Sequence, residues 1–150
     1  MFTDQYNLLV GKELKLNLIK TVNAEDEFDL LPFYYFEILT HQNELVGKIS
    51  FRIGFNEYTI YNGNIGYEID QKYRGNNYSL NALKLLKPLI KFHNQHTIFI
   101  TTNSDNIASN KIAKKANGNL VGKFTVEEDH KFFTGETKIK HVYLIHIDDL

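Results

Sequence analysis

The chain has 150 residues, the length of one ordinary domain. Hydrophobic residues make up 43% of it, enough for a core, so a wholly disordered chain is excluded. Its 17 Lys and Arg nearly balance its 18 Asp and Glu, which disfavours a strongly basic nucleic-acid binder. The absence of Cys excludes disulfides, thiolate catalysis and Cys-ligated zinc. Arginine is rare, so its two positions, Arg52 and Arg74, are of interest.

We expect a single domain over residues 1–150, because no internal repeat or linker-like segment interrupts the sequence. Residues 1–13 hold one short apolar run with no basic residue before it, which is not the pattern of an export signal. Every apolar stretch is far shorter than the roughly 20 residues that a membrane-spanning helix needs. The protein is therefore expected to be cytoplasmic, without a membrane or nucleic-acid partner, and a homodimer stays open.

The first half of the chain is dominated by strand signals. Alternation of apolar and polar residues, or a high content of aromatic and β-branched residues, predicts strands over 14–20, 33–40, 45–55 and 63–70. Asn23 followed by acidic residues predicts a short capped helix over 23–28, which Pro32 helps to end. Asn62-Gly63 is typical of a tight turn.

The second half mixes helices with strands. Apolar residues at helical spacing predict a helix over 79–93, kinked or shortened at Pro88 because proline lacks the backbone donor. A second helix is predicted over 106–116, closed by Asn117-Gly118. Further strands are predicted over 97–102, 120–127 and 139–147. The strand–helix–strand–helix order in the middle requires a crossover, so we expect an α+β domain on a mixed sheet with one locally parallel pair.

The most informative segment joins the strand over 63–70 to the helix over 79–93. Its short loop ends where free backbone N–H groups and the positive end of the helix converge. Gly75 lets the backbone approach a ligand closely, and Arg74 adds a cation beside it. The junction predicts an anion site suited to phosphate, with an ordinary strand-to-helix turn as the alternative.

A second segment, over 103–118, also follows a strand and opens a helix. The two segments together resemble the cofactor motifs of the GCN5-related N-acetyltransferase (GNAT) family, through Tyr73-Arg74-Gly75-x-x-Tyr78-Ser79 and Asn106-x-x-Ser109-x-Lys111 followed by Asn117-Gly118. The order of elements resembles the family from about residue 14 onwards. The resemblance implies the GNAT fold, a mixed, mostly antiparallel sheet with a parallel central strand pair splayed at the cofactor site and flanking helices.

The resemblance also implies that acetyl-CoA binds between the splayed strands. The backbone around Ile69 would pair with the pantetheine arm in the manner of an added strand. Backbone groups of the loop and first helical turn would hold the pyrophosphate, at Arg74, Gly75, Asn76, Asn77, Tyr78 and Ser79. Asn106, at the start of the second helix, and Asn110, one turn later, would reach the cofactor. The alternatives are a plain helix cap for Asn106 and a solvated surface residue for Asn110.

The implied reaction is direct transfer of the acetyl group from acetyl-CoA to a primary amine of a small molecule or a protein N-terminus. Glu68 is the candidate general base and Glu37 the second candidate, with an exposed strand carboxylate as the alternative for each. A backbone N–H near Ile69 or Asp70 is expected to stabilise the oxyanion. The His residues show no paired metal-ligand spacing, so no metal is expected.

One position leaves the activity open. Many members of the family carry a Tyr on the second helix as general acid toward the leaving thiolate, and the matching residue here is Ala113. A non-catalytic CoA-binding regulatory module is therefore the alternative function, and a protein-interaction domain is a third. The near-neutral charge gives no indication of the acceptor amine.

Overall fold

A computed structural model describes residues 1–24, 31–136 and 138–150. The short helix predicted over 23–28 falls largely on residues 25–30, outside the described part of the chain. No helix in the described ranges is long and apolar enough to cross a membrane.

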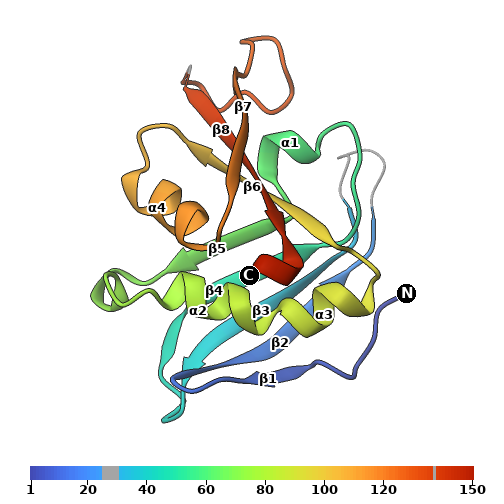
Figure 1. Cartoon of the computed structure of the whole chain (residues 1–150), viewed down its shortest axis with the longest axis vertical. Coiled ribbons are helices and arrows are strands. Elements are labelled where there is room, and N and C mark those ends of the chain that lie inside the picture. Colours follow the sequence, from blue (N-terminus) through green and yellow to red (C-terminus); the bar gives the residue numbers. More distant parts are fainter. Residues whose placement is uncertain (25–30, 137) are drawn as a thin grey trace.

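Five antiparallel strands form the larger of two sheets, in the order β1-β2-β3-β4-β5 (Figure 1). These strands are β1 (Leu8–Val10), β2 (Leu14–Val22), β3 (Phe33–Thr40), β4 (Leu45–Arg52) and β5 (Ile65–Ile69). Apolar side chains alternate along them, and the inward set, including Leu16, Phe36 and Phe51, is fully buried. This alternation is the physical reason that the sequence predicted four of the five strands.

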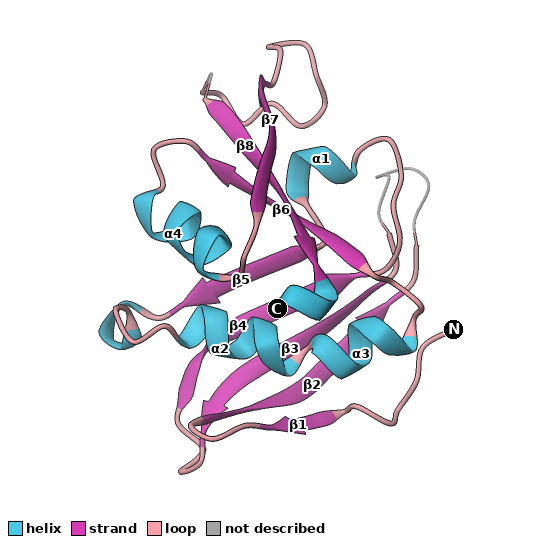
Figure 2. Ribbon diagram, in the orientation of Figure 1, coloured by secondary structure: helices cyan, strands magenta, loops and turns pink. Residues whose placement is uncertain are grey.

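Two consecutive helices, α2 (Tyr78–Leu85) and α3 (Lys87–Phe92), cover one face of this sheet (Figure 2). Their buried side chains, among them Leu83, Leu86 and Ile90, complete the main core. Pro88 stands in the first turn of α3, where its missing N–H costs nothing. The prediction that Pro88 interrupts one long helix is confirmed. No described helix lies on the opposite face of this sheet, here called the outer face.

The smaller sheet has the order β6-β8-β7, again antiparallel. Its strands are β6 (Thr97–Asn103), β7 (Asn119–Thr125) and β8 (Ile139–His146), and α4 (Ile107–Lys115) connects the first two. Ala113 of α4 and the C-cap residue Ala116 are buried against the core, where a larger side chain would not fit without rearrangement. The sheet carries α4 at the end where β5 and β6 are far apart (Figure 1).

The two sheets join at one buried residue, Asn64, immediately before β5. Its backbone N–H donates to the Phe99 carbonyl of β6 at 2.8 Å, and its side-chain oxygen accepts from the Phe99 N–H at 2.8 Å. On the other side, its carbonyl accepts from the Arg52 N–H at 2.7 Å, and its amide nitrogen donates to the carbonyls of Arg52 and Gly54. Asn64 therefore fastens β4, β5 and β6 at one point, beyond which β5 and β6 diverge.

The structure corrects the expected topology in three places. Every pairing among the described strands is antiparallel, and β5 and β6, predicted as a parallel pair, meet at Asn64 without forming a ladder. The sequence did not predict β1. It also did not predict the short helix α1 (Thr59–Asn62), which ends at the predicted turn, where Gly63 has φ +69°.

Candidate functional site

β5 and β6 diverge from Asn64 like the two arms of a V. At the open end of this V, one edge of β5 has no described strand paired with it. β5 is the last strand of its sheet, and the Asp70 N–H donates to Val46 of β4 at 2.8 Å. Backbone donors alternate sides along a strand, so the N–H groups of Tyr67 and Ile69 face the free edge. An extended ligand would find strand-like partners here. The Ile69 carbonyl already accepts from Arg74 Nε at 3.0 Å.

The loop after β5 has an unusual backbone that the sequence explains. A 3-10 turn over Gln71–Tyr73 leads into Gly75 at φ +87° and Asn77 at φ +59°. Glycine and asparagine are the residues that adopt such positive φ values at least cost. Open space surrounds the position that a side chain of Gly75 would occupy. The loop therefore presents its backbone rather than side chains.

The start of α2 has no side-chain cap. Asn77 is the N-cap residue, but its side chain does not bond to the helix; instead its oxygen accepts from Lys115 Nζ at 2.8 Å. The N–H groups of the first turn have no partners within the helix. Tyr78 is half-buried and Ser79 is buried, so their backbones lie at the base of the loop. The positive end of the helix and the Lys115 ammonium lie close together here, an arrangement that favours negative charge.

Two of the predicted loop residues use their side chains to hold the loop itself. The exposed Asn76 amide donates to the Tyr73 carbonyl at 3.0 Å, and the exposed Arg74 bonds to Ile69 as described. Arg74 retains further donors in its guanidinium fork. Both residues lie on the predicted loop.

The start of α4 is closed in a different way. The Asn106 side-chain oxygen accepts from the Ser109 N–H at 3.0 Å, which is the geometry of a plain N-cap. Asn106 is exposed, and its amide donors make no bond to another described residue. The cap expected as the alternative for Asn106 is therefore present, and the amide nitrogen stays available to a ligand.

Asn110 is a structural hub rather than a surface residue. It is 8% exposed, which rules out the solvated alternative. Its amide nitrogen donates to the carbonyls of Asn103 and Asn106, at 3.0 and 2.8 Å. Its oxygen lies within hydrogen-bonding distance of three side chains, Thr102 (2.8 Å), Tyr143 (2.7 Å) and His141 (3.1 Å). All of its polar capacity is used internally, so a ligand would have to displace one of these bonds.

Comparison with known proteins places this geometry in a family. The sequence profile described as "Acetyltransferase (GNAT) domain" matches residues 14–119. The chain belongs to the GNAT acetyltransferase family. A search of curated proteins found no match.

Solved GNAT structures share the fold over nearly the whole chain. A GNAT acetyltransferase from Bacillus anthracis is 19% identical, with a TM-score of 0.70 over 94% of this chain and 99% of that one. The ribosomal-protein-S5-alanine acetyltransferase of Vibrio fischeri is 15% identical, with a TM-score of 0.68 over 95% and 97%. RimL, a ribosomal L7/L12 alpha-N-protein acetyltransferase in complex with coenzyme A, is 17% identical, with a TM-score of 0.68 over 95% and 99%. At these identities the likeness establishes the GNAT fold.

One polar group of the GNAT cleft was missed by sequence reasoning. The Tyr67 hydroxyl is buried beside the Ser109 side chain but forms no hydrogen bond of standard geometry with a described residue. Burial raises the pKa of Tyr67, and the nearby Ser109 side chain of α4 opposes that rise. A buried hydroxyl between β5 and α4 without a partner is unusual in a complete structure and fits a place where a ligand supplies one. Alternation along β5 assigned Tyr67 to the core, and nothing in the pattern distinguished its hydroxyl.

The predicted catalytic carboxylates lie together on the outer face. Glu68 is exposed, and Lys48 of β4 is its cross-strand neighbour. Glu37 stands opposite Lys48 on the next strand, and its Oε1 accepts from Asn17 Nδ2 at 2.9 Å. Of the two backbone donors considered for the oxyanion, that of Asp70 is used in the β4 ladder, whereas that of Ile69 faces the free edge.

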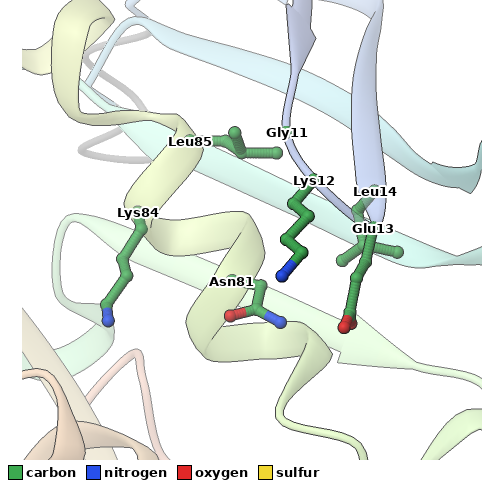
Figure 3. A pocket seen from close by; sticks show the side chains of 7 residues that line it. All are labelled: Gly11, Lys12, Glu13, Leu14, Asn81, Lys84 and Leu85. Carbon is green, nitrogen blue, oxygen red and sulfur yellow. The ribbon is translucent and has the colours of Figure 1, made fainter.

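The GNAT domain also has a surface pocket apart from the cleft. A surface pocket of about 220 Å³ separates the β1–β2 turn from α2, and Figure 3 shows its lining side chains, Gly11, Lys12, Glu13, Leu14, Asn81, Lys84 and Leu85. Its side chains carry charges of both signs, and we assign it no ligand. Over residues 1–24, 31–136 and 138–150, His, Asp and Glu side chains form no group of three able to hold a metal ion.

Proposed function

We propose that this GNAT domain is an acetyl-CoA-dependent N-acetyltransferase that acts on a primary amine. The observation that carries the proposal is the uncapped start of α2 at the open end of the V. Gly75 and Asn77 turn the backbone there so that first-turn N–H groups and Lys115 face one point. Such a site suits the pyrophosphate of a CoA ester.

The remaining backbone groups of the cleft suit the rest of the ligand. The N–H groups of Tyr67 and Ile69 lie along the free edge of β5, where the amides of a pantetheine arm would extend the sheet. The unpartnered Tyr67 hydroxyl would gain a hydrogen bond there. Asn106 would contribute its free amide nitrogen. Asn110 would act through α4, because its own side chain is fully bonded.

The chemistry that acetyl-CoA supplies is an activated acyl group, which is transferred as a C–N bond forms and a C–S bond breaks. The attacking amine must be neutral, so a base has to accept its proton. Glu68 is exposed on the strand that lines the cleft and can take that proton directly or through water. We propose the Ile69 N–H as the donor to the oxyanion, which leaves the Tyr67 N–H on the free edge to the pantetheine arm. Ala113 is fully buried and offers no proton to the thiolate, so solvent would supply it.

The acceptor is proposed as a small-molecule amine or a protein N-terminus. The Vibrio fischeri enzyme is a ribosomal-protein-S5-alanine acetyltransferase and RimL is a ribosomal L7/L12 alpha-N-protein acetyltransferase, which supports a protein N-terminus as one class to test. The second candidate is a CoA-binding module without turnover, and the absence of a Tyr at position 113 favours it.

Thermal unfolding with and without acetyl-CoA tests the ligand. At a hundredfold excess over Kd the ligand stabilises the fold by about 2.7 kcal/mol, which corresponds to a rise in Tm of about 5 to 10 °C for a chain of this size. No rise in Tm at millimolar acetyl-CoA would overturn the proposal.

Turnover is tested with a panel of amines and detection of free thiol. Because the chain has no Cys, a thiol reagent reports released CoA without background from the protein. Thiol release that depends on one amine class supports the acetyltransferase. Binding without amine-dependent release would support the CoA-binding module instead.

A further inference from the structure

Arg52 lies at the end of β4, on the outer face of the large sheet. The second arginine, Arg74, is on the loop after β5. Arg52 Nη1 donates to the carbonyls of Asn62 and Gly63, at 3.4 Å in each case. The guanidinium rests over Gly66 of β5, where an added Cβ would come within 3.2 Å of Nη2. Gly66 therefore leaves room for a cation directly on the strand that lines the cleft.

Among the described residues, Arg52 has no carboxylate partner. None of the described Asp or Glu side chains forms an ion pair with it, and its Nε and Nη2 donate to no residue within the described ranges. The side chain is half-buried, and burial lowers the pKa of its guanidinium, although an arginine stays charged at neutral pH. A partly desolvated guanidinium with unused N–H donors on two nitrogens is costly unless an anion accepts hydrogen bonds from them. The planar fork of the guanidinium matches a carboxylate.

The guanidinium is held in place by the end of α1, which packs against the segment between β7 and β8. The carbonyls that it contacts belong to the end of α1, and Tyr61 of α1 packs against the segment between β7 and β8. Its ring stacks on His130 at 4.6 Å and on Phe132 at 5.2 Å between centroids. Asn64, next to these carbonyls, is the fully bonded junction of the sheets. Arg52 is thus pre-positioned, which lowers the entropy cost of binding an anion.

Arg52 and Glu68 lie on the same, outer face of the large sheet. Gly66 and Glu68 lie two residues apart on β5, so their side-chain positions share the outer face and are about 7 Å apart. The Arg52 guanidinium, which lies over Gly66, and the Glu68 side chain are therefore on the same face of the sheet. A small molecule that bears an amine and a carboxylate can address both groups at once.

We propose that Arg52 binds a carboxylate of the acceptor, so that the acceptor is an amine with a carboxylate close to it. The assignment rests on the proposed acetyltransferase function and narrows its substrate class. Two sources carry this chemistry: a free amino acid, and an N-terminal residue with an acidic side chain.

Matched acceptors separate these sources. In one arm, free amino acids are compared with their C-terminal amides; in the other, peptides beginning with Asp are compared with peptides beginning with Asn. In at least one arm the carboxylate form should show a kcat/KM about ten- to a hundredfold higher, the range expected for a charge-assisted hydrogen bond. Equal values in both arms would overturn the proposal.

Variants assign the preference to Arg52. Arg52→Gln should remove the carboxylate preference while kcat/KM for the carboxylate-free acceptor stays within about twofold, and Arg52→Lys should retain part of it. Lys20→Gln, which removes a cation from the same face at β2, is the control and should keep the full preference. Urea unfolding of each variant checks that the bonds to Asn62 and Gly63 are not required for folding. A preference unchanged in Arg52→Gln would contradict the assignment.

Carboxylate binding at Arg52 can be measured by NMR independently of acetyl transfer. The chain has two arginines, so a ¹⁵N spectrum has two Nε–H signals to assign, with Arg74→Lys identifying one. Glycine betaine, which carries a carboxylate but no reactive amine, should shift the Arg52 signal, and choline should not. A shift without any amine acetylation would leave Arg52 as an anion site and reject the acetyltransferase. An unmoved Arg52 signal, in a protein that acetylates amines, would reject the carboxylate site alone.

Discussion

The two helices that begin at the open end of the V are built in opposite ways. At α4, the Asn106 side chain caps the Ser109 N–H, and Asn110 ties the first turn to β6 and β8. At α2, no side chain caps the helix, and the N-cap Asn77 takes a left-handed backbone. One helix start is completed by the protein's own groups, whereas the other is left with unpaired donors.

The contrast indicates which helix start serves a ligand and which serves the fold. Unpaired N–H groups at a helix start are stabilised by a side chain, by water or by an anion. Because α4 uses side chains, its asparagines contribute mainly to stability. Because α2 lacks them and adds Lys115, we propose that the phosphate binds at its start. The sequence motifs alone predicted that both helix starts contact the cofactor.

The largest effect is expected from Asn110→Leu. The substitution leaves the buried hydroxyls of Thr102 and Tyr143 without their partner, so the free energy of unfolding should fall by about 3 to 5 kcal/mol. Urea unfolding measures the loss. Asn81→Leu is the matched control on α2, where the half-exposed side chain makes no hydrogen bond to a described residue. A loss below about 1 kcal/mol for Asn110→Leu would contradict the conclusion that the start of α4 is stabilised by its own side chains.

The next effect is expected from Gly75→Val, which addresses the α2 end. A β-branched residue at φ +87° costs about 1 to 2 kcal/mol of stability, and it places a side chain in the open space over the loop. Gly135→Val is the control, because Gly135 has φ +88° with the same open surroundings away from the loop. Both variants should lose similar stability, but only Gly75→Val should lose the rise in Tm with acetyl-CoA. Equal rises in both would place the phosphate elsewhere.

The fold followed from the sequence where burial is regular. The apolar–polar alternation in β2 and the helical spacing in α2 and α3 reflect which side chains face the core and which face solvent, and each pattern predicted the right element. β1 and α1 have three and four residues, too few for a period to show. The divergence of β5 and β6 depends on Asn64, whose role comes from partners far away in sequence.

In the proposed site, the backbone conformation was predictable from the sequence and the side-chain contacts were not. Gly75 and its neighbours indicated a loop that exposes N–H groups, because local chemistry alone determines that conformation. Asn106 and Asn110 share a motif and a residue type, yet one is an exposed cap and the other a buried hub. The difference arises from Thr102 and Tyr143, whose approach no local pattern records.

A smaller effect is expected from Asn106→Ala. The loss of the N-cap bond should lower the free energy of unfolding by about 1 kcal/mol, the usual value for such a cap. Urea unfolding provides the value, and calorimetry gives the acetyl-CoA affinity of the same sample. If the cap is the main role of Asn106, the affinity should change by less than about threefold. A tenfold loss would show that its free amide nitrogen binds the ligand, and would bring α4 into the site.

The smallest effect is expected from Asn77→Gly, and it decides what the α2 start uses. Glycine accepts φ +59° without strain, so stability should change by only a few tenths of a kcal/mol, although the exposed bond to Lys115 is lost. Asn77→Ala removes the same side chain but strains the backbone by about 1 kcal/mol. If backbone N–H groups hold the phosphate, Asn77→Gly should keep the acetyl-CoA affinity within about twofold, and Asn77→Ala should weaken it. A tenfold loss in Asn77→Gly would mean that the side chain, with Lys115, binds the anion, and the two helix starts would then differ only in which side chain they use.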